Sequence, residues 1–252
     1  MTKYRILKSS VSTLEGYGIE GILHKSQNID KTILQPHKLR GLSPKIDPAS
    51  ALSVLPIIEH EMILSHFTPE KIGIIIGTRL GNHQMARSYS EKIRRKAASP
   101  STYSVSGYNM CAGLSALSEK YKGPSVVLPG KQISFCEILI LGMNYLSRND
   151  AEAMLIGQVD ITDNGDWGLG IFVSIIASDS CKDGISLTID NNLDSYIAEF
   201  PDCKFLQAVR EKSPQLEEAL KIHLYCSDYD ASANFAPFQM YSKIGMGKIY
   251  LS

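Results

Sequence analysis

The sequence has no excess of either charge and no apolar run long enough to cross a bilayer. Lys and Arg number 26, as do Asp and Glu, so the 252-residue chain has no formal net charge at pH 7. Proteins built to bind nucleic acid usually carry a basic excess, so we expect no nucleic-acid partner. The first ten residues lack the apolar core of a signal peptide. The longest apolar stretch, residues 133–146, contains Glu137 and is shorter than the roughly 20 residues of a membrane span. We therefore expect a cytoplasmic protein without a membrane span.

Metal-binding and cofactor motifs are also missing. The five cysteines are scattered and form no CxxC pair, which favours reduced thiols in a cytosolic protein. His60 and His66 lie six residues apart, a spacing that suits neither one helix face nor a metal site. Residues 129–132, Pro-Gly-Lys-Gln, lack the earlier glycine and the Ser or Thr after lysine that a phosphate loop requires. The sequence thus predicts neither a metal nor a cofactor.

Apolar periodicity predicts helices and strands that alternate through the first 180 residues. Helices are expected over residues 48–66, 82–96, 109–120 and 133–146, and strands over 71–78, 125–128, 151–157, 171–177 and 184–190. This alternation is typical of α/β layering around a mostly parallel sheet. Short β-like runs precede it at residues 4–7 and 19–23. Residues 213–225 are expected to form a helix followed by a strand, and residues 227–252 show no clear period.

Gln132 stands at the most informative position in the chain. It follows the predicted strand 125–128 and the turn 129–131, and it directly precedes the predicted buried helix. Many enzymes place a nucleophile at such an elbow, because the helix N-terminus stabilises negative charge. A glutamine amide forms neither a thioester nor an ester. The elbow therefore has the architecture of a nucleophile site without a nucleophile.

Several segments together resemble the N-terminal half of a β-ketoacyl synthase, a condensing enzyme of the thiolase fold. They are the Gly-rich strand 72–78, residues 99–100 and 109–113 ahead of the nucleophile, residues 122–125 that open the nucleophile strand, and residues 150–157 after the nucleophile helix. The match runs from about residue 40 to residue 177. The resemblance implies one ketosynthase-like domain over residues 1–252, essentially one half of the duplicated fold. Residues 178–252 would be a reduced or divergent C-terminal part.

The chain departs from this family at its catalytic residues. Counted from Gly123-Pro124-Ser125, the family's catalytic cysteine falls at Gln132. The family also uses two histidines, or a histidine and an asparagine, from the second half of the fold, and here His223 is the single histidine after residue 177. Cys136, four residues after Gln132, is either a displaced nucleophile or a buried structural thiol. We therefore assign no catalytic residue.

Glutamine at this position is similar to two kinds of relative. The short length favours a chain-length factor, as in aryl polyene and flexirubin systems, which pairs with an active ketosynthase and shapes its acyl pocket during malonyl condensation on acyl carrier protein. One alternative is a Gln-type ketosynthase that decarboxylates malonyl-carrier protein for priming. The other is an acyl or carrier-protein binding module without a ketosynthase partner, although a half-fold is expected to leave an apolar face uncovered. The implied partners are a ketosynthase, as a heterodimer or higher assembly, and an acyl carrier protein.

The resemblance also suggests where these partners would bind. The edge strand Ser125, Val126, Val127 and Leu128 would add to the partner's equivalent strand. Ser101, Thr102 and Tyr103, with Gln132, would line or gate the acyl pocket, unless the segment is a plain surface loop. The basic run Lys92, Arg94, Arg95 and Lys96 would dock an acidic carrier protein, or it is an ordinary solvated helix face.

Overall fold

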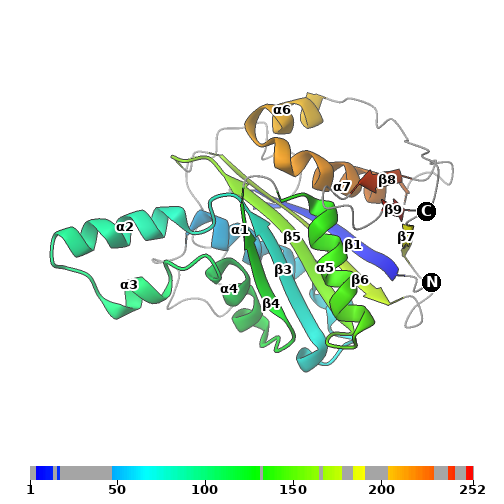
Figure 1. Cartoon of the computed structure of the whole chain (residues 1–252), viewed down its shortest axis with the longest axis horizontal. Coiled ribbons are helices and arrows are strands. Elements are labelled where there is room, and N and C mark those ends of the chain that lie inside the picture. The colour runs from blue at the N-terminus through cyan, green and yellow to red at the C-terminus, as the bar shows by residue number, and fades with distance from the viewer. Residues whose placement is uncertain are drawn as a thin grey trace.

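A single sheet runs through the molecule, with helices on both faces (Figure 1). The computed structural model describes residues 4–13, 16–17, 47–130, 133–164, 167–177, 184–190, 204–229, 238–241 and 248–251. In spatial order the strands are β4 (Ser125–Pro129), β3 (Ile72–Thr78), β5 (Ala153–Ile161), β6 (Gly168–Ala177), β1 (Tyr4–Thr13), β7 (Ile185–Asp190), β9 (Lys248–Leu251) and β8 (Phe238–Tyr241). The short β2 (Gly16–Tyr17) pairs with β1.

Strand direction changes across the sheet. β3 is parallel to both β4 and β5, whereas every other described pair is antiparallel. The α/β layered fold is confirmed, but the sheet is mixed rather than mostly parallel. β5 and β6 follow each other closely in the chain, and the Thr162 amide donates to the Trp167 carbonyl over 2.9 Å, as expected where a short connection joins antiparallel strands. Helices cover both faces here, so these strands are buried along almost their whole length and mainly apolar, whatever their direction.

Two helical layers enclose the sheet. On one face lie α1 (Pro48–Leu64) and α4 (Met110–Glu119), and on the other α5 (Phe135–Ser147) and α7 (Glu217–Tyr229). Alternate residues of β5 point to opposite faces of the sheet. Met154 and Ile156 pack in the cluster on the side of α5 and α7, and Leu155 and Val159 pack in the cluster on the side of α1 and α4. Both faces of the central strands are therefore covered within the chain. The expectation of an uncovered apolar face is wrong for the described residues.

The C-terminal segment supplies part of this cover. It contains α6 (Lys204–Lys212), the 3-10 turn η5 (Pro214–Leu216) and α7. Its buried apolar side chains belong to the main core cluster together with those of α5; they are Leu206, Val209, Leu216, Ala219, Leu220, Ile222 and Tyr225. None of the helices in the described part of the chain is long and apolar enough to span a membrane.

Two helices project from this body as an arm, residues 83–104 (Figure 1). They are α2 (His83–Arg94) and α3 (Pro100–Ser104), and no residue of α2 is buried. The rings of Tyr89 and Tyr103 hold the two helices together, with their centroids 5.5 Å apart. The arm also carries Ile93 and Tyr103, two of the few large apolar side chains that are exposed among the described residues.

Most predicted elements are confirmed to within a few residues, and the differences lie mainly near the C-terminus. Residues 213–225 form η5 and most of α7, so the strand expected at their end is wrong. The sequence reading missed α3, α6, β8 and β9. The β-like run 19–23 lies outside the described residues. A further 3-10 turn, η3 (Pro69–Lys71), leads into β3.

Candidate functional site

The start of α5 is the centre of the candidate site, because it lies just beyond the elbow. β4 ends at Pro129, and the Gly130 amide donates to the Thr78 carbonyl over 3.0 Å. Gln132 lies outside the described residues. α5 begins at Phe135, two residues later than predicted, with Ser134 as its N-cap.

A capping box sets this helix start. The Glu137 amide donates to the Ser134 hydroxyl, and the Ser134 amide donates to Glu137 Oε2, each over 3.2 Å. Two of the amides that a helix start leaves without an intrahelical acceptor are thus satisfied by neighbouring side chains. One negative carboxylate consequently lies at the positive end of the helix dipole.

A second carboxylate reaches the same helix start from the C-terminal segment. The Cys136 amide donates to Glu218 Oε2 over 3.2 Å, although the two residues are 82 positions apart. Glu218 belongs to the first turn of α7. The amide dipoles that would stabilise an anion in a catalytic elbow therefore already bind carboxylates of the chain itself.

The environment of Cys136 is that of a structural thiol. Its side chain is fully buried, and burial raises the pKa of the thiol above its ordinary value. The nearby carboxylates of Glu218 and Glu137 raise the pKa further. A nucleophilic cysteine needs the opposite surroundings, an electropositive and accessible position. These surroundings favour the buried structural thiol over the displaced nucleophile.

β5 holds the other side of this helix start. Gln158 Nε2 donates to the Ile133 carbonyl over 3.1 Å, directly before the N-cap. Only 2% of Gln158 is exposed, and its Oε1 has no hydrogen-bond partner among the described residues. The start of α5 is thus fixed to the sheet by Gln158 and to α7 by Glu218.

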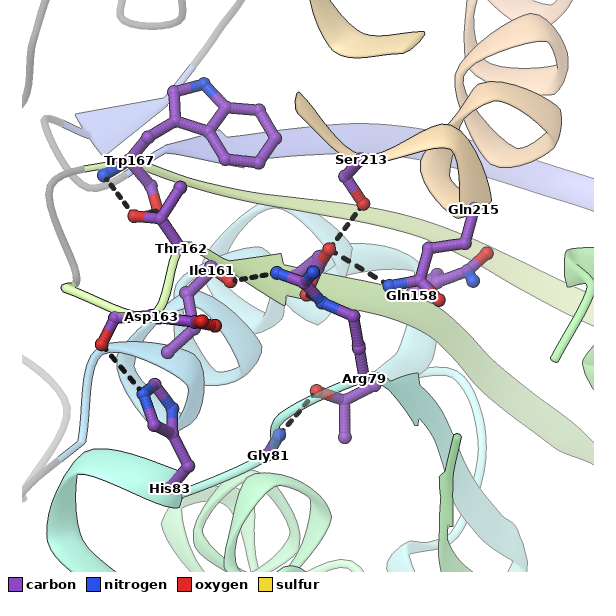
Figure 2. A network of polar contacts seen from close by, with 12 residues as sticks. Arg79, Gly81, His83, Gln158, Ile161, Thr162, Asp163, Trp167, Ser213 and Gln215 are labelled. Carbon is purple, nitrogen blue, oxygen red and sulfur yellow. Dashed lines mark hydrogen bonds and ion pairs between the residues drawn. The ribbon is translucent and has the colours of Figure 1, made fainter. Parts of the chain in front are cut away.

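A buried carboxylate on the same face of β5 organises a larger polar cluster. Asp160 is 1% exposed, and Arg79 Nε lies 3.3 Å from its Oδ1. Ser213 and Gln215 donate to its Oδ2, the latter over 2.9 Å. Figure 2 shows the side chains of Arg79, Ser213 and Gln215 converging on this point. Because residues 213–215 lead directly into α7, Asp160 helps to set where α7 begins.

The same cluster secures the root of the arm. Arg79 Nη2 also donates to the Ile161 carbonyl over 3.0 Å, and His83 Nε2 lies 3.0 Å from the Asp163 carbonyl (Figure 2). In the first turn of α2, the Met85 amide donates to Oδ2 of Asp47, the N-cap of α1, over 2.9 Å. Burial raises the pKa of the Asp47 carboxyl, although these backbone hydrogen bonds oppose the shift. The arm therefore leaves the body from a rigid polar base.

His223 does not form part of a catalytic pair in the described structure. Its Nδ1 lies 3.1 Å from Ser9 Oγ of β1, and burial lowers its pKa to about 4. On the opposite face of β1, His60 Nε2 lies 2.8 Å from Ser10 Oγ, and burial lowers its pKa to about 3. His60 is buried and His223 is half-buried; both are neutral at pH 7, and each bonds a serine hydroxyl. Among the described residues no group of three His, Cys, Asp or Glu could hold a metal ion.

The other predicted site residues lie apart from the start of α5. Ser125 to Leu128 form most of β4, which is an edge strand with β3 on one side and no described strand on the other. Ser101, Thr102 and Tyr103 lie in α3 of the arm, where Thr102 is buried and the other two are exposed. The basic run lies at the end of α2 or just beyond it, with all four side chains exposed; they are Lys92, Arg94, Arg95 and Lys96.

Sequence reasoning missed Arg79, Asp160 and Glu218. Arg79 directly follows β3, and Asp160 lies near the end of β5. These strands are parallel neighbours, so their carboxyl ends meet at the same edge of the sheet, and this shared edge was the signal that could have found the pair. Glu218 gave no local signal, since its contact with Cys136 joins distant segments.

Comparison with known proteins shows the fold. No protein-family model and no curated protein matches the sequence. Among solved structures, the ishigamide ketosynthase/chain length factor is similar with a TM-score of 0.57 and 15% identity, over 71% of this chain and 63% of that one. The ketosynthase ApeO in complex with its chain length factor ApeC, from Xenorhabdus doucetiae, is similar with a TM-score of 0.56 and 12% identity, over 100% of this chain and 99% of that one.

A third similar structure is the AntDE:AntF complex, a type II PKS acyl-carrier protein with its ketosynthase bound to the hexaketide. Its TM-score is 0.61 at 12% identity, over 100% of this chain and 98% of that one. The chain thus spans 63% of the first structure and nearly all of the other two. At these identities the likeness shows the fold alone: the chain adopts the ketosynthase-like fold.

The buried histidines make the stability of the chain sensitive to acid. Between pH 6.5 and the lowered pKa of about 4, the unfolded chain protonates His223 and the folded chain does not. The free energy of unfolding should therefore decrease as the pH is lowered through this window, by up to about 1.4 kcal/mol per pH unit for each such histidine, and be flat above it. Urea titrations at pH 4.5 to 7.5 measure this.

We expect His223→Asn to reduce the acid loss, whereas His66→Asn, at an exposed position, should leave it unchanged. An equal pH dependence in the wild type and His223→Asn would contradict the assignment.

Proposed function

We propose that this chain is a non-catalytic, chain-length-factor-like subunit that pairs with an active ketosynthase. In this role it would shape the acyl pocket during iterative malonyl condensation on acyl carrier protein, in polyketide, aryl polyene or related biosynthesis. The ketosynthase-like fold supports the proposal, and so does Gln132 at the position of the family's cysteine. The observation that carries it is the start of α5, where Glu137 and Glu218 accept from amides of the helix start that are otherwise able to stabilise an anion. A cytoplasmic location stays a prediction.

The edge strand β4 supports pairing with another subunit. In a parallel ladder, alternate residues direct both backbone groups to the same neighbour. The Pro124 carbonyl and the Gly130 amide bond β3, so the even-numbered residues between them face inward. Ser125 and Val127 consequently turn their amides and carbonyls to the open side. An uncovered edge of this kind is a template for a strand of another chain.

The arm supports a contribution to a shared acyl pocket. Thr102 is held inside it by Ser99 Oγ over 3.0 Å, while the Tyr103 side chain is 65% exposed. Because the arm projects from a rigid base, these residues would reach a partner without rearrangement of the body (Figure 1). In the proposed assembly Ser101, Thr102 and Tyr103 line or gate the pocket.

The charge of the arm supports a carrier-protein contact. Residues 83–104 contain five Lys or Arg residues and a single acid, Glu91, in a chain with no net charge overall. The basic run is exposed at the far end of α2. An acidic carrier protein would be steered to such a patch, and the attraction would weaken with salt.

The two rival functions have less support. A Gln-type decarboxylase would have to stabilise a developing enolate beside the start of α5, where two carboxylates oppose further negative charge. A binding module without a ketosynthase partner would leave β4 open, together with the exposed Ile93 and Tyr103 of the arm. No observation of the described residues favours either function.

Reconstitution with the ketosynthase encoded beside this chain tests the proposal. The ketosynthase, acyl carrier protein and malonyl donor would be assayed with and without the chain, and the length of the acyl product measured by mass spectrometry. We expect condensation, or a product of defined length, only when the chain is present. A ketosynthase that is active alone, with unchanged product length, would overturn the proposal.

Proline substitutions in β4 test the interface. Val127→Pro removes an amide that faces the open edge, so it should lower co-purification with the ketosynthase at least about tenfold while the chain stays folded. Val126→Pro is the control for position, since it removes a bond to β3 and should destabilise the chain itself. Undiminished pairing of a folded Val127→Pro chain would exclude β4 as the interface.

Charge reversal tests the carrier contact. We expect Arg94→Glu with Arg95→Glu to weaken carrier-protein binding about tenfold or more at low salt, with a smaller effect at 0.5 M salt. Arg148→Glu, at an exposed site outside the arm, is the matched control and should have little effect. Binding would be measured by fluorescence anisotropy of labelled carrier protein. An equal loss in both variants would show that only overall charge matters.

A further inference from the structure

We infer that Glu218 is an internal plug, a carboxylate from the C-terminal segment that closes the anion-binding start of α5. The inference rests on the proposed function for its meaning, because that function requires the chemistry to lie in the partner subunit. Beyond that function, we assign the closure of the start of α5 to one contact, the hydrogen bond from the Cys136 amide to Glu218. The contact itself lies within this chain.

The geometry leaves little room for another anion at this helix start. The amides of Ser134, Cys136 and Glu137 all donate to side chains of the protein. Cys136 is fully buried and Ser134 is 6% exposed. An incoming oxyanion would have to displace Glu218 from the Cys136 amide and then lie close to the remaining Glu137 carboxylate.

The position of Glu218 is determined by the way α7 is held. Its neighbour Glu217 accepts from Arg210 over 2.9 Å and from Lys221 over 2.8 Å, so the first turn of α7 is tied to α6 and to its own second turn. Immediately before this turn, η5 is joined to the sheet through Asp160. Glu218 is therefore directed toward α5 by contacts on both sides of it.

Apolar burial keeps the segment in place. The side chains of Leu220, Ile222 and Tyr225 are at most 1% exposed and pack in the same cluster as those of Phe135 and Ile138 of α5. The backbone of α7 is thereby held beside α5, so the Glu218 side chain starts from a fixed position within reach of the Cys136 amide.

A functional consequence follows for the proposed assembly. An anion brought to the start of α5 would meet two carboxylates there instead of free amide dipoles, and a thiolate would be disfavoured for the same reason. In the proposed assembly, the missing cysteine and the closed helix start would be two independent reasons for the lack of catalysis in this chain.

A thiol probe at the helix start tests the inference in the full chain without any ketosynthase. Ser134→Cys places a thiol at the N-cap of α5, and its alkylation by iodoacetamide is followed peptide by peptide from pH 6 to 10. Adding Glu218→Gln, which keeps the shape of the side chain and removes its charge, should lower the alkylation midpoint by about one pH unit. The rate at pH 7 should then rise about tenfold.

Glu217→Gln is the matched control, because it removes the neighbouring charge without touching the contact to Cys136. It should change the alkylation rate less than about twofold. Equal effects of the two substitutions, or no effect of Glu218→Gln, would overturn the plug.

Hydrogen exchange provides a second measurement that does not depend on the probe. With Ser134 intact, Glu218→Ala should speed amide exchange in residues 135–138 about tenfold or more, and Glu217→Ala should not. Unchanged exchange in Glu218→Ala would contradict the inference even if the thiol variants fail to fold. If these experiments contradict the plug while the chain still pairs with the ketosynthase, the proposed function stands. If they support the plug but the chain does not pair, the plug stands and the proposed function does not.

Discussion

A helix start must find acceptors for its first amides, and here that requirement shapes the whole candidate site. In the start of α5 the acceptors are the Ser134 hydroxyl, the Glu137 carboxylate and the Glu218 carboxylate. The same amides and the same dipole would stabilise an anionic nucleophile in a condensing enzyme. Burial, and after it the nearby carboxylates of Glu218 and Glu137, raise the pKa of the Cys136 thiol, and α7 is docked where Glu218 reaches the Cys136 amide.

The side of the molecule covered by the C-terminal segment is closed by contacts within the chain, whereas the side of β4 and the arm presents exposed groups. On one side the C-terminal segment covers the sheet, and Asp160 ties that segment to β5 and, through Arg79, to the root of the arm. On the other side no described strand lies beyond β4, and the arm exposes both its basic run and Tyr103. A helix start closed by the chain's own carboxylates, together with a strand edge left open among the described residues, fits the proposed role of a subunit that contributes shape to a complex.

Local patterns predicted what depends on neighbours in the chain, and they failed where distant contacts decide. The β-branched run of β3 and the periodic apolar positions of α1 were sufficient to locate both elements. The start of α5 was placed two residues early because the apolar run was read without the capping box that Ser134 and Glu137 form three residues apart. The antiparallel half of the sheet and the Glu218 contact depend on residues far apart in sequence, which periodicity does not reveal. The family resemblance predicted the fold, while the residue that closes the site came only from the structure.

The mass of the complex formed with the ketosynthase tests the central claim most directly. A tagged form of this chain would be expressed together with the ketosynthase encoded beside it, purified through the tag and weighed by native mass spectrometry. We expect a stoichiometric heterodimer, or a multiple of it. A stable monomer or homodimer that does not retain the ketosynthase would contradict it.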